Sequence, residues 1–233
     1  MESAWTIWRT PPLKTFTACS DPISMSKLLL LITFVLLAGS VRAGAYDDIL
    51  AAAENGENAT VIDLLQRGMD VNTTDRAGTS LLMMASRTGN VSLMEMLLAN
   101  RAGINRRNQY GDTALMLAAI NAKLPALQIL LAKGAEMETT GWTALHYAVF
   151  GGDPEVLSTL IGKKAKLDNR APNGQTALML AAKLGKVDLV KLLIDADADM
   201  DLADFEGNTA LRLALKAGNA EIAAYLRSVG AVE

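Results

Sequence analysis

The chain has 233 residues and a formal net charge of −3 at pH 7, from 22 basic and 25 acidic side chains. Its single histidine and single cysteine exclude a zinc site built from nitrogen and sulfur ligands, and its glycines do not form a phosphate-binding loop. We therefore expect no metal and no cofactor.

The first 43 residues differ in pattern from the rest of the chain. Lys27 precedes the apolar run LLLLITFVLLA (28–38), and small residues follow as far as Ala43. Such a pattern is typical of a secretory signal peptide, and the run is shorter than the ~20 residues that a membrane-spanning helix needs. We predict a signal peptide over residues 25–43, cleaved after Ala43 or, as an alternative, after Ala45.

Residues 1–24 lie upstream of this signal. We interpret them as a gene-start artefact, with Met25 as the true start; the alternative is an extended and genuine n-region, and we expect disorder in either case. Without residues 1–43 the chain has 18 basic and 23 acidic residues and no cysteine. This charge argues against nucleic acid or an anionic membrane as the main partner. We expect a bacterial periplasmic or secreted protein that is not stably inserted in a membrane after cleavage.

The rest of the chain, residues 44–233, contains an internal repeat. The frame G-x-[ST]-x-L-x-x-A occurs five times, at intervals of 33, 30, 33 and 33 residues, and a second apolar block follows each copy. The copies begin at Gly78, Gly111, Gly141, Gly174 and Gly207. A further N-terminal unit starts at YDDILAAAENG and lacks the frame. A period of this length indicates structural units that stack on one another.

These units resemble the ankyrin repeat, whose T-P-L-H-x-A core lies in a unit of about 33 residues. The copy most similar to it is TALHYA at Thr143, and the resemblance covers about residues 44–233. It implies an all-α fold: an ankyrin-repeat solenoid of about six units, each a helix–turn–helix pair with a β-turn finger. Such a solenoid is stabilised by the interfaces between neighbouring units.

The resemblance gives roles to the residues at the ends of the expected helices. Hydroxyl side chains that can cap the first helix of a unit are Ser80, Thr113, Thr143, Thr176 and Thr209. Glycines that suit the turn between the two helices are Gly89, Gly152, Gly185 and Gly218. Ala122 breaks that pattern, so we predict a different turn there. After the second helix the family favours a left-handed glycine, which Arg101, Lys164 and Asp197 replace.

Few residues of the repeats suggest chemistry. His146 is the only histidine, and the resemblance implies that its imidazole braces the turn. The string Asp195, Asp197, Asp199 and Asp201 alternates like a calcium loop, but it lacks the glycine and the glutamate that an EF-hand requires. We interpret these carboxylates as solvated and predict that the protein is not an enzyme.

In this family the fingers and first helices line a concave side that commonly binds proteins. Six residues at such positions are aromatic or apolar, although other units carry polar residues in the equivalent places: Tyr110, Ile120, Trp142, Phe150, Leu184 and Phe205. Aromatic residues are enriched in interface hot spots, so we propose these six as partner-binding residues. The alternative is that each side chain rests on its neighbouring finger.

The sequence therefore favours a monomeric periplasmic module for protein–protein interaction, a scaffold or accessory protein for an unidentified envelope partner. One alternative is an inhibitor or immunity-type protein that binds a toxic partner. A small enzyme that uses His146 would need this side chain exposed in a cleft beside a carboxylate. A membrane-anchored adaptor would retain the signal segment.

One finger is expected to be shorter than the others. Four units have ten residues from the end of the second helix to the next repeat glycine, but only seven separate Gly134 from Gly141. We predict a notch in the row of fingers, with Trp142 between the fingers that carry Tyr110 and Asn173. In one hypothesis Trp142 anchors a partner in this notch; in the other it merely fills the gap.

Arg227 lies in the last unit, at a second-helix position where earlier units have leucine or isoleucine. A charge is tolerated there only if no further unit covers it, and terminal repeats need a polar outer face. We predict that Arg227 is exposed and caps the C-terminal end of the row.

Overall fold

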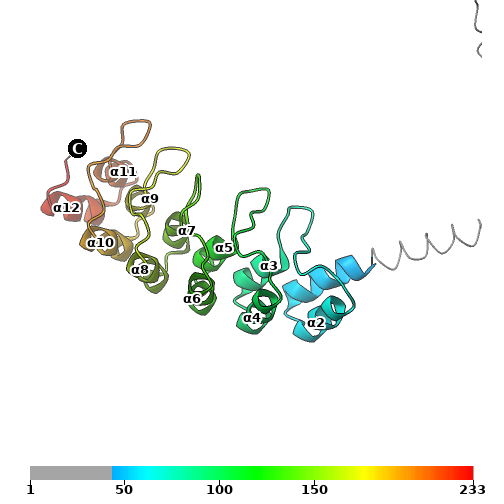
Figure 1. The fold of residues 1–233 in the computed structure, drawn as a ribbon. Coiled ribbons are helices and arrows are strands. Elements are labelled where there is room, and N and C mark those ends of the chain that lie inside the picture. The colour runs from blue at the N-terminus through cyan, green and yellow to red at the C-terminus, as the bar shows by residue number, and fades with distance from the viewer. Residues whose placement is uncertain (1–43, 233) are drawn as a thin grey trace, which may run out of the picture. The chain divides into compact units, whose positions relative to one another are not determined.

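The structure, a computed structural model, describes residues 44–232. The signal peptide expected over residues 25–43 and the segment 1–24 lie outside the described residues. A helix over residues 44–55 forms the first pair with α2 (Asn58–Gln66). Five more pairs follow (Figure 1): α3 (Leu81–Thr88) and α4 (Val91–Ala99), α5 (Ala114–Ile120) and α6 (Leu124–Ala132), α7 (Ala144–Gly151) and α8 (Pro154–Gly162), α9 (Ala177–Lys183) and α10 (Val187–Asp195), α11 (Ala210–Lys216) and α12 (Ala220–Ser228).

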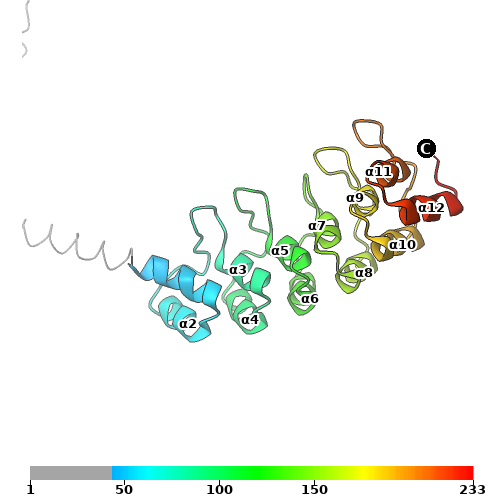
Figure 2. The same ribbon diagram turned by 180° about the vertical axis from the view of Figure 1, so that it is seen from behind.

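The helix pairs stand side by side in a row. The first helices pack on one another in the order α3, α5, α7, α9 and α11, and the second helices α4, α6, α8, α10 and α12 form a parallel layer. A finger precedes each first helix from α3 on, and the fingers project from the same side of the row (Figures 1 and 2). Within residues 44–232 this confirms the all-α solenoid of about six units. No helix in this range is long and apolar enough to cross a bilayer.

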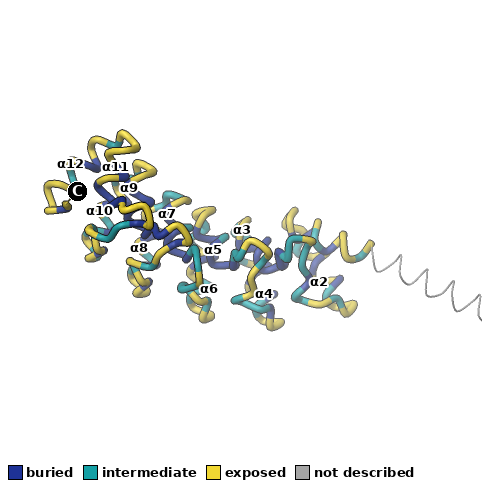
Figure 3. Tube along the Cα trace, turned by 90° about the horizontal axis from the view of Figure 1, so that it is seen from above, coloured by how far each residue is buried: buried dark blue, intermediate teal, exposed yellow. Residues whose placement is uncertain are grey.

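The core is a continuous ribbon of leucine, alanine and methionine side chains between the pairs. Buried residues run along the middle of the row, while the exposed ones lie at the fingers and outer turns (Figure 3). Alanine dominates where first helices meet; Ala118, Ala148 and Ala181, for example, are fully buried. Small side chains allow this close approach, so that each pair is stabilised chiefly by its neighbours.

Four of the five predicted hydroxyls cap their helices, whereas the Thr143 hydroxyl lies 2.8 Å from the Nδ1 atom of His146. The hydroxyls of Ser80, Thr113, Thr176 and Thr209 each accept a hydrogen bond of 3.3 Å from the backbone N–H three residues later. In three of these units a methionine sulfur accepts the N–H of the capping residue in return, at 3.4–3.5 Å. In α7 the Nδ1 atom of His146 takes the place of that sulfur, at 3.3 Å from the Thr143 nitrogen.

The residues with left-handed φ angles agree with the predictions from the sequence except at Ala122. Arg101, Lys164 and Asp197 have φ angles of 64°, 63° and 64° after the second helices, as predicted. The prediction of a different turn at Ala122 was wrong, because its φ of 52° is also left-handed. Lys123 donates its N–H to the Ala118 carbonyl at 2.9 Å, the bond that also closes the turns at Gly89, Gly185 and Gly218. The two helices fix the turn, so the alanine bears a strain of up to about 1 kcal/mol.

A ladder of hydrogen bonds holds each finger to the next. In every rung a side-chain oxygen of one finger accepts a backbone N–H of the following segment, at 2.8–3.4 Å. The rungs are Asn72 with Gly103, Asn105 with Glu136, Glu138 with Lys166, Asp168 with Asp199, and Asp201 with Val232. Part of the acidic string of the last finger therefore has a structural role.

Candidate functional site

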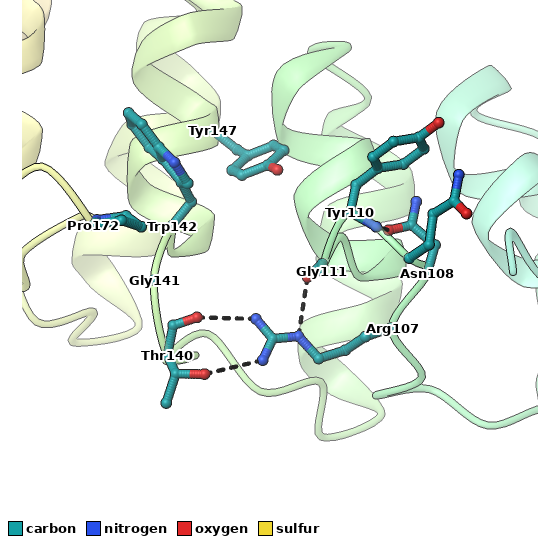
Figure 4. A pocket seen from close by; sticks show the side chains of 10 residues that line it. Arg107, Asn108, Tyr110, Gly111, Thr140, Gly141, Trp142, Tyr147 and Pro172 are labelled. Carbon is teal, nitrogen blue, oxygen red and sulfur yellow. Dashed lines mark hydrogen bonds between the residues drawn. The ribbon is translucent and has the colours of Figure 1, made fainter. Parts of the chain in front are cut away.

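The short finger before α7 is held by an arginine of the preceding finger. The guanidinium of Arg107 donates from Nε to the Gly111 carbonyl at 3.0 Å, from Nη1 to the Thr140 hydroxyl at 3.2 Å, and from Nη2 to the Thr140 carbonyl at 3.1 Å (Figure 4). Arg170 makes the equivalent contact two fingers on, with the Ala203 carbonyl at 2.6 Å. These arginines fix the spacing of neighbouring fingers, a role that the sequence did not reveal.

A pocket of about 430 Å³ lies at the predicted notch. Its walls come from two fingers, from α7 and from the tip of the next finger (Figure 4): Arg107, Asn108, Gln109, Tyr110, Gly111, Thr140, Gly141, Trp142, Tyr147 and Pro172. We call it the notch pocket. Trp142 and Tyr110 line it, as predicted, and the finger that carries Asn173 flanks it from the other side through Pro172. The Pro172 ring lies against Gly141, and Asn173 lines a separate pocket.

Trp142 both lines the notch pocket and packs beneath it. Its ring is half-buried, with its centroid 5.3 Å from that of His146 at 85° and 5.3 Å from that of Phe150 at 52°. Edge-to-face and tilted ring pairs of this kind are favourable. The filling role and the lining role of Trp142 are therefore compatible, and its contact with Phe150 joins the finger to the end of α7.

Tyr147 is a wall of the notch pocket that our sequence analysis missed. Its hydroxyl donates to the Asp112 carboxylate of the preceding finger. Burial raises the pKa of Tyr147 most strongly, and the hydrogen bond and negative charge of Asp112 raise it further, so the phenol stays protonated and its ring is held in place. One signal was available: at this position the other four units have Met84, Leu117, Leu180 and Leu213.

His146 has a structural environment. It is 1% exposed; Nδ1 lies 2.8 Å from the Thr143 hydroxyl, and Nε2 lies 3.1 Å from the Gln175 carbonyl of the next finger. Because a carbonyl only accepts, Nε2 carries the proton. Burial lowers the pKa of His146, while the bond to Gln175 raises it in part. The condition for the enzyme alternative, an exposed histidine beside a carboxylate in a cleft, is not met. Residues 44–232 also contain no cluster of side chains that could hold a metal.

The proposed binding residues other than Trp142 are exposed, and only Tyr110 among them lines the notch pocket. Tyr110 and Phe205 are each 73% exposed, and Ile120, Phe150 and Leu184 are each about two-fifths exposed. Phe205 also rests on the neighbouring finger, since a Cβ added to Gly174 would lie 2.8 Å from its Cδ1 atom. The structure thus brings Tyr110 and Trp142 together in the notch pocket and places Phe150 against Trp142. Ile120, Leu184 and Phe205 do not line the notch pocket.

Comparison with known families assigns the repeats. A family model described as ankyrin repeats (3 copies) matches residues 49–140, 82–171 and 145–232. A search of curated proteins found no match to the chain. The matched ranges include every finger, the notch pocket and both arginine clamps.

Proposed function

The chain belongs to the ankyrin-repeat family, whose repeats form modules for protein–protein interaction, and we propose that it binds its protein partner through the finger side of the row. The notch pocket is the anchor of this surface. The flanking apolar side chains enlarge the contact area around it.

One observation carries the proposal: five of the large apolar side chains that are exposed on fingers and first-helix ends are residues proposed above for binding, and they lie outside the continuous buried core. They are Tyr110, Ile120, Phe150, Leu184 and Phe205. Burying each of them fully would contribute about 1.5–3 kcal/mol, and exposed apolar patches on soluble proteins mark interaction sites. A protein partner that covers the finger side accounts for their exposure.

The place of action that we propose is the bacterial envelope. It is supported by the signal-like pattern over residues 25–43 and by the absence of cysteine from residues 44–233. The module would there hold or shield an envelope protein, as scaffold or accessory factor. Sequencing the N-terminus of the protein from the envelope fraction tests this location. A start at Gly44 or Tyr46 supports it, and intact protein that begins at Met1 contradicts it.

Site-specific photo-crosslinking in the native organism tests the binding surface. The crosslinker p-benzoylphenylalanine replaces Tyr110 in one strain and Ala132, an exposed residue of α6 in the second-helix layer, in a control strain. The proposal expects a discrete adduct from position 110 that is absent at position 132. Equal adducts, or none from position 110, would contradict it. The captured protein also decides the role: a toxin would indicate the inhibitor alternative, and an envelope enzyme the accessory role.

A further inference from the structure

The notch pocket has an unusual wall for this chain. Only 5% of all residues are aromatic, yet Tyr110, Trp142 and Tyr147 line it together, with the ring of Pro172 beside them. Trp142 and Tyr110 lie on opposite sides with Tyr147 between them, and Arg107 connects Gly111 with Thr140 (Figure 4). Flat rings around an open cleft suit a flat or cyclic side chain of a guest.

The charge of the pocket selects between the guests that aromatic walls can hold. Arg107 is the only charged residue of the wall. Its hydrogen bonds go to uncharged oxygens, and the ion pairs of residues 44–232 are Arg67 with Asp63 and Arg87 with Glu54. The Asp112 carboxylate that accepts the Tyr147 hydroxyl bond lies nearby but forms no ion pair with Arg107. The guanidinium therefore still opposes a cationic guest, which aromatic rings alone would attract. It instead favours a guest with a carboxylate, which a guanidinium binds through charge-assisted hydrogen bonds.

The hydrogen-bonding groups of the wall also indicate which guest the pocket favours. Among residues 44–232, the indole N–H of Trp142 and the hydroxyl of Tyr110 have no hydrogen-bond acceptor, so both are available as donors. The Arg107 guanidinium has five N–H groups, of which three are used in the bonds to Gly111 and Thr140. The pocket therefore offers donors to a guest that is rich in acceptors.

A proline-rich segment has these complementary properties. Proline lacks an N–H, so such a segment presents carbonyl acceptors. In the polyproline II conformation it has no internal hydrogen bonds, and its rings dock into grooves lined by aromatic side chains. We propose that the notch pocket binds an extended, proline-rich segment of the protein partner that carries an aspartate or glutamate next to its prolines. The prolines lie against Tyr110, Trp142 and Tyr147, and the carboxylate binds Arg107. This inference rests on the proposed function.

Peptide titrations of the full chain test this partner class. The probe is the acetylated, amidated peptide Gly-Pro-Pro-Pro-Asp-Pro-Pro-Gly. Matched peptides replace the aspartate by asparagine, replace it by lysine, or replace all prolines by alanine. Binding is followed by the 15N-resolved indole N–H signal of Trp142, which the variant Trp142→Phe identifies. We expect the aspartate peptide to shift this signal and to bind about tenfold more tightly than the asparagine peptide. We expect no shift with the alanine peptide.

Two arginine variants separate the charge of Arg107 from its clamping role. Arg107→Gln should remove the preference for aspartate over asparagine, while the requirement for proline persists. Arg170→Gln removes the equivalent clamp outside the notch pocket and should change neither. If Arg107→Gln fails to fold, the salt dependence of the preference in the unmodified protein replaces it, because a charge contact must weaken as salt is added.

The outcomes separate this inference from the proposed function. Tightest binding of the lysine peptide would overturn the inference, as would equal binding of the alanine peptide. The inference would also be overturned if millimolar peptide left the indole N–H signal of Trp142 unshifted while the crosslink from position 110 still captured a partner. In that case the proposed function would stand. Loss of that crosslink would instead overturn the proposed function itself.

Discussion

His146 is held between two repeats by both nitrogen atoms of its ring. Nδ1 completes the cap of α7, and Nε2 donates to the Gln175 carbonyl of the next finger. Three other first helices have methionine in this place, and the Met179 sulfur caps α9 in the same manner. Methionine can therefore replace the capping function of histidine but not the bond from α7 to the next finger.

This difference predicts the cost of two substitutions. His146→Met keeps a cap and loses the bond to Gln175, whose carbonyl retains the Ala171 N–H at 2.8 Å. We expect a loss of about 1 kcal/mol in the free energy of unfolding. His146→Ala also leaves a cavity and should cost about 2–5 kcal/mol. Urea unfolding measures both, and an equal cost for the two variants would show that the methionine cap does not form.

A pH dependence of stability also follows from His146. Since burial lowers its pKa below the ordinary 6.5, the unfolded chain binds a proton at this residue before the folded chain does. We therefore predict that the free energy of unfolding decreases as the pH falls below about 6.5. His146→Met serves as the control, because carboxylates titrate in both proteins. Between about pH 7.5 and pH 5, unfolding by urea should lose less stability in the variant; identical slopes would contradict the prediction.

Tyr110 and Trp142 separate binding from stability. Tyr110 is 73% exposed, so Tyr110→Ala should change stability by less than about 0.5 kcal/mol and still weaken partner binding. Trp142 packs on His146 and Phe150, so Trp142→Ala should weaken binding and also lower stability by about 1–3 kcal/mol. Thermal unfolding and partner titration of both variants measure this. Unchanged binding in Tyr110→Ala would place the anchor elsewhere.

At the scale of the elements, the distance between first helices is set by residues without side-chain bulk. A Cβ built on Gly151, the last residue of α7, would lie 2.7 Å from the carbonyl oxygens of Ala119 and Ile120 at the end of α5. Backbone oxygens at this distance cannot yield without moving α5. Gly162 ends α8 in the same helical conformation, but a Cβ there would meet nothing within 4 Å.

These two glycines form a matched pair for mutation. Gly151→Ala should lower the free energy of unfolding by about 1–3 kcal/mol, because it forces α5 and α7 apart. Gly162→Ala should be neutral or stabilise by up to about 1 kcal/mol, because alanine favours the helix. Urea unfolding of the two variants compares them. Similar effects would mean that α5 and α7 can separate at little cost.

The arrangement of the elements also explains which features the sequence could predict. The helix caps and the left-handed residues depend on the chain within a few residues, and Ser80, Arg101 and Lys164 were assigned correctly. The clamp by Arg107 and the bond from Tyr147 to Asp112 join residues 33 and 35 positions apart. Such contacts depend on how neighbouring units are placed, which the repeat frame alone does not give. The turn at Ala122 was misjudged because its neighbouring helices, not its own preference, decide its conformation.

At the scale of the whole molecule, a solenoid needs a polar outer face on its terminal repeat. Leu65, Leu98, Leu131, Ile161 and Ile194 pack partly buried against the core at one position of the second helices. Leu98 lines a groove with Ile129 of α6, which shows that this position faces the following pair. Arg227 occupies the position in α12 and is exposed, as predicted. No later pair follows it within residues 44–232.

Arg227→Leu tests whether this charge prevents end-to-end association. The leucine would extend the apolar row onto an uncovered face, and its burial against a second molecule would contribute about 1.5–3 kcal/mol. We expect an unchanged fold by circular dichroism but concentration-dependent association in sedimentation velocity. Ser92→Leu, which places a leucine at an exposed position of α4 inside the row, should remain monomeric. A monomeric Arg227→Leu at every concentration, or equal association of both variants, would show that the C-terminal face is closed by other means.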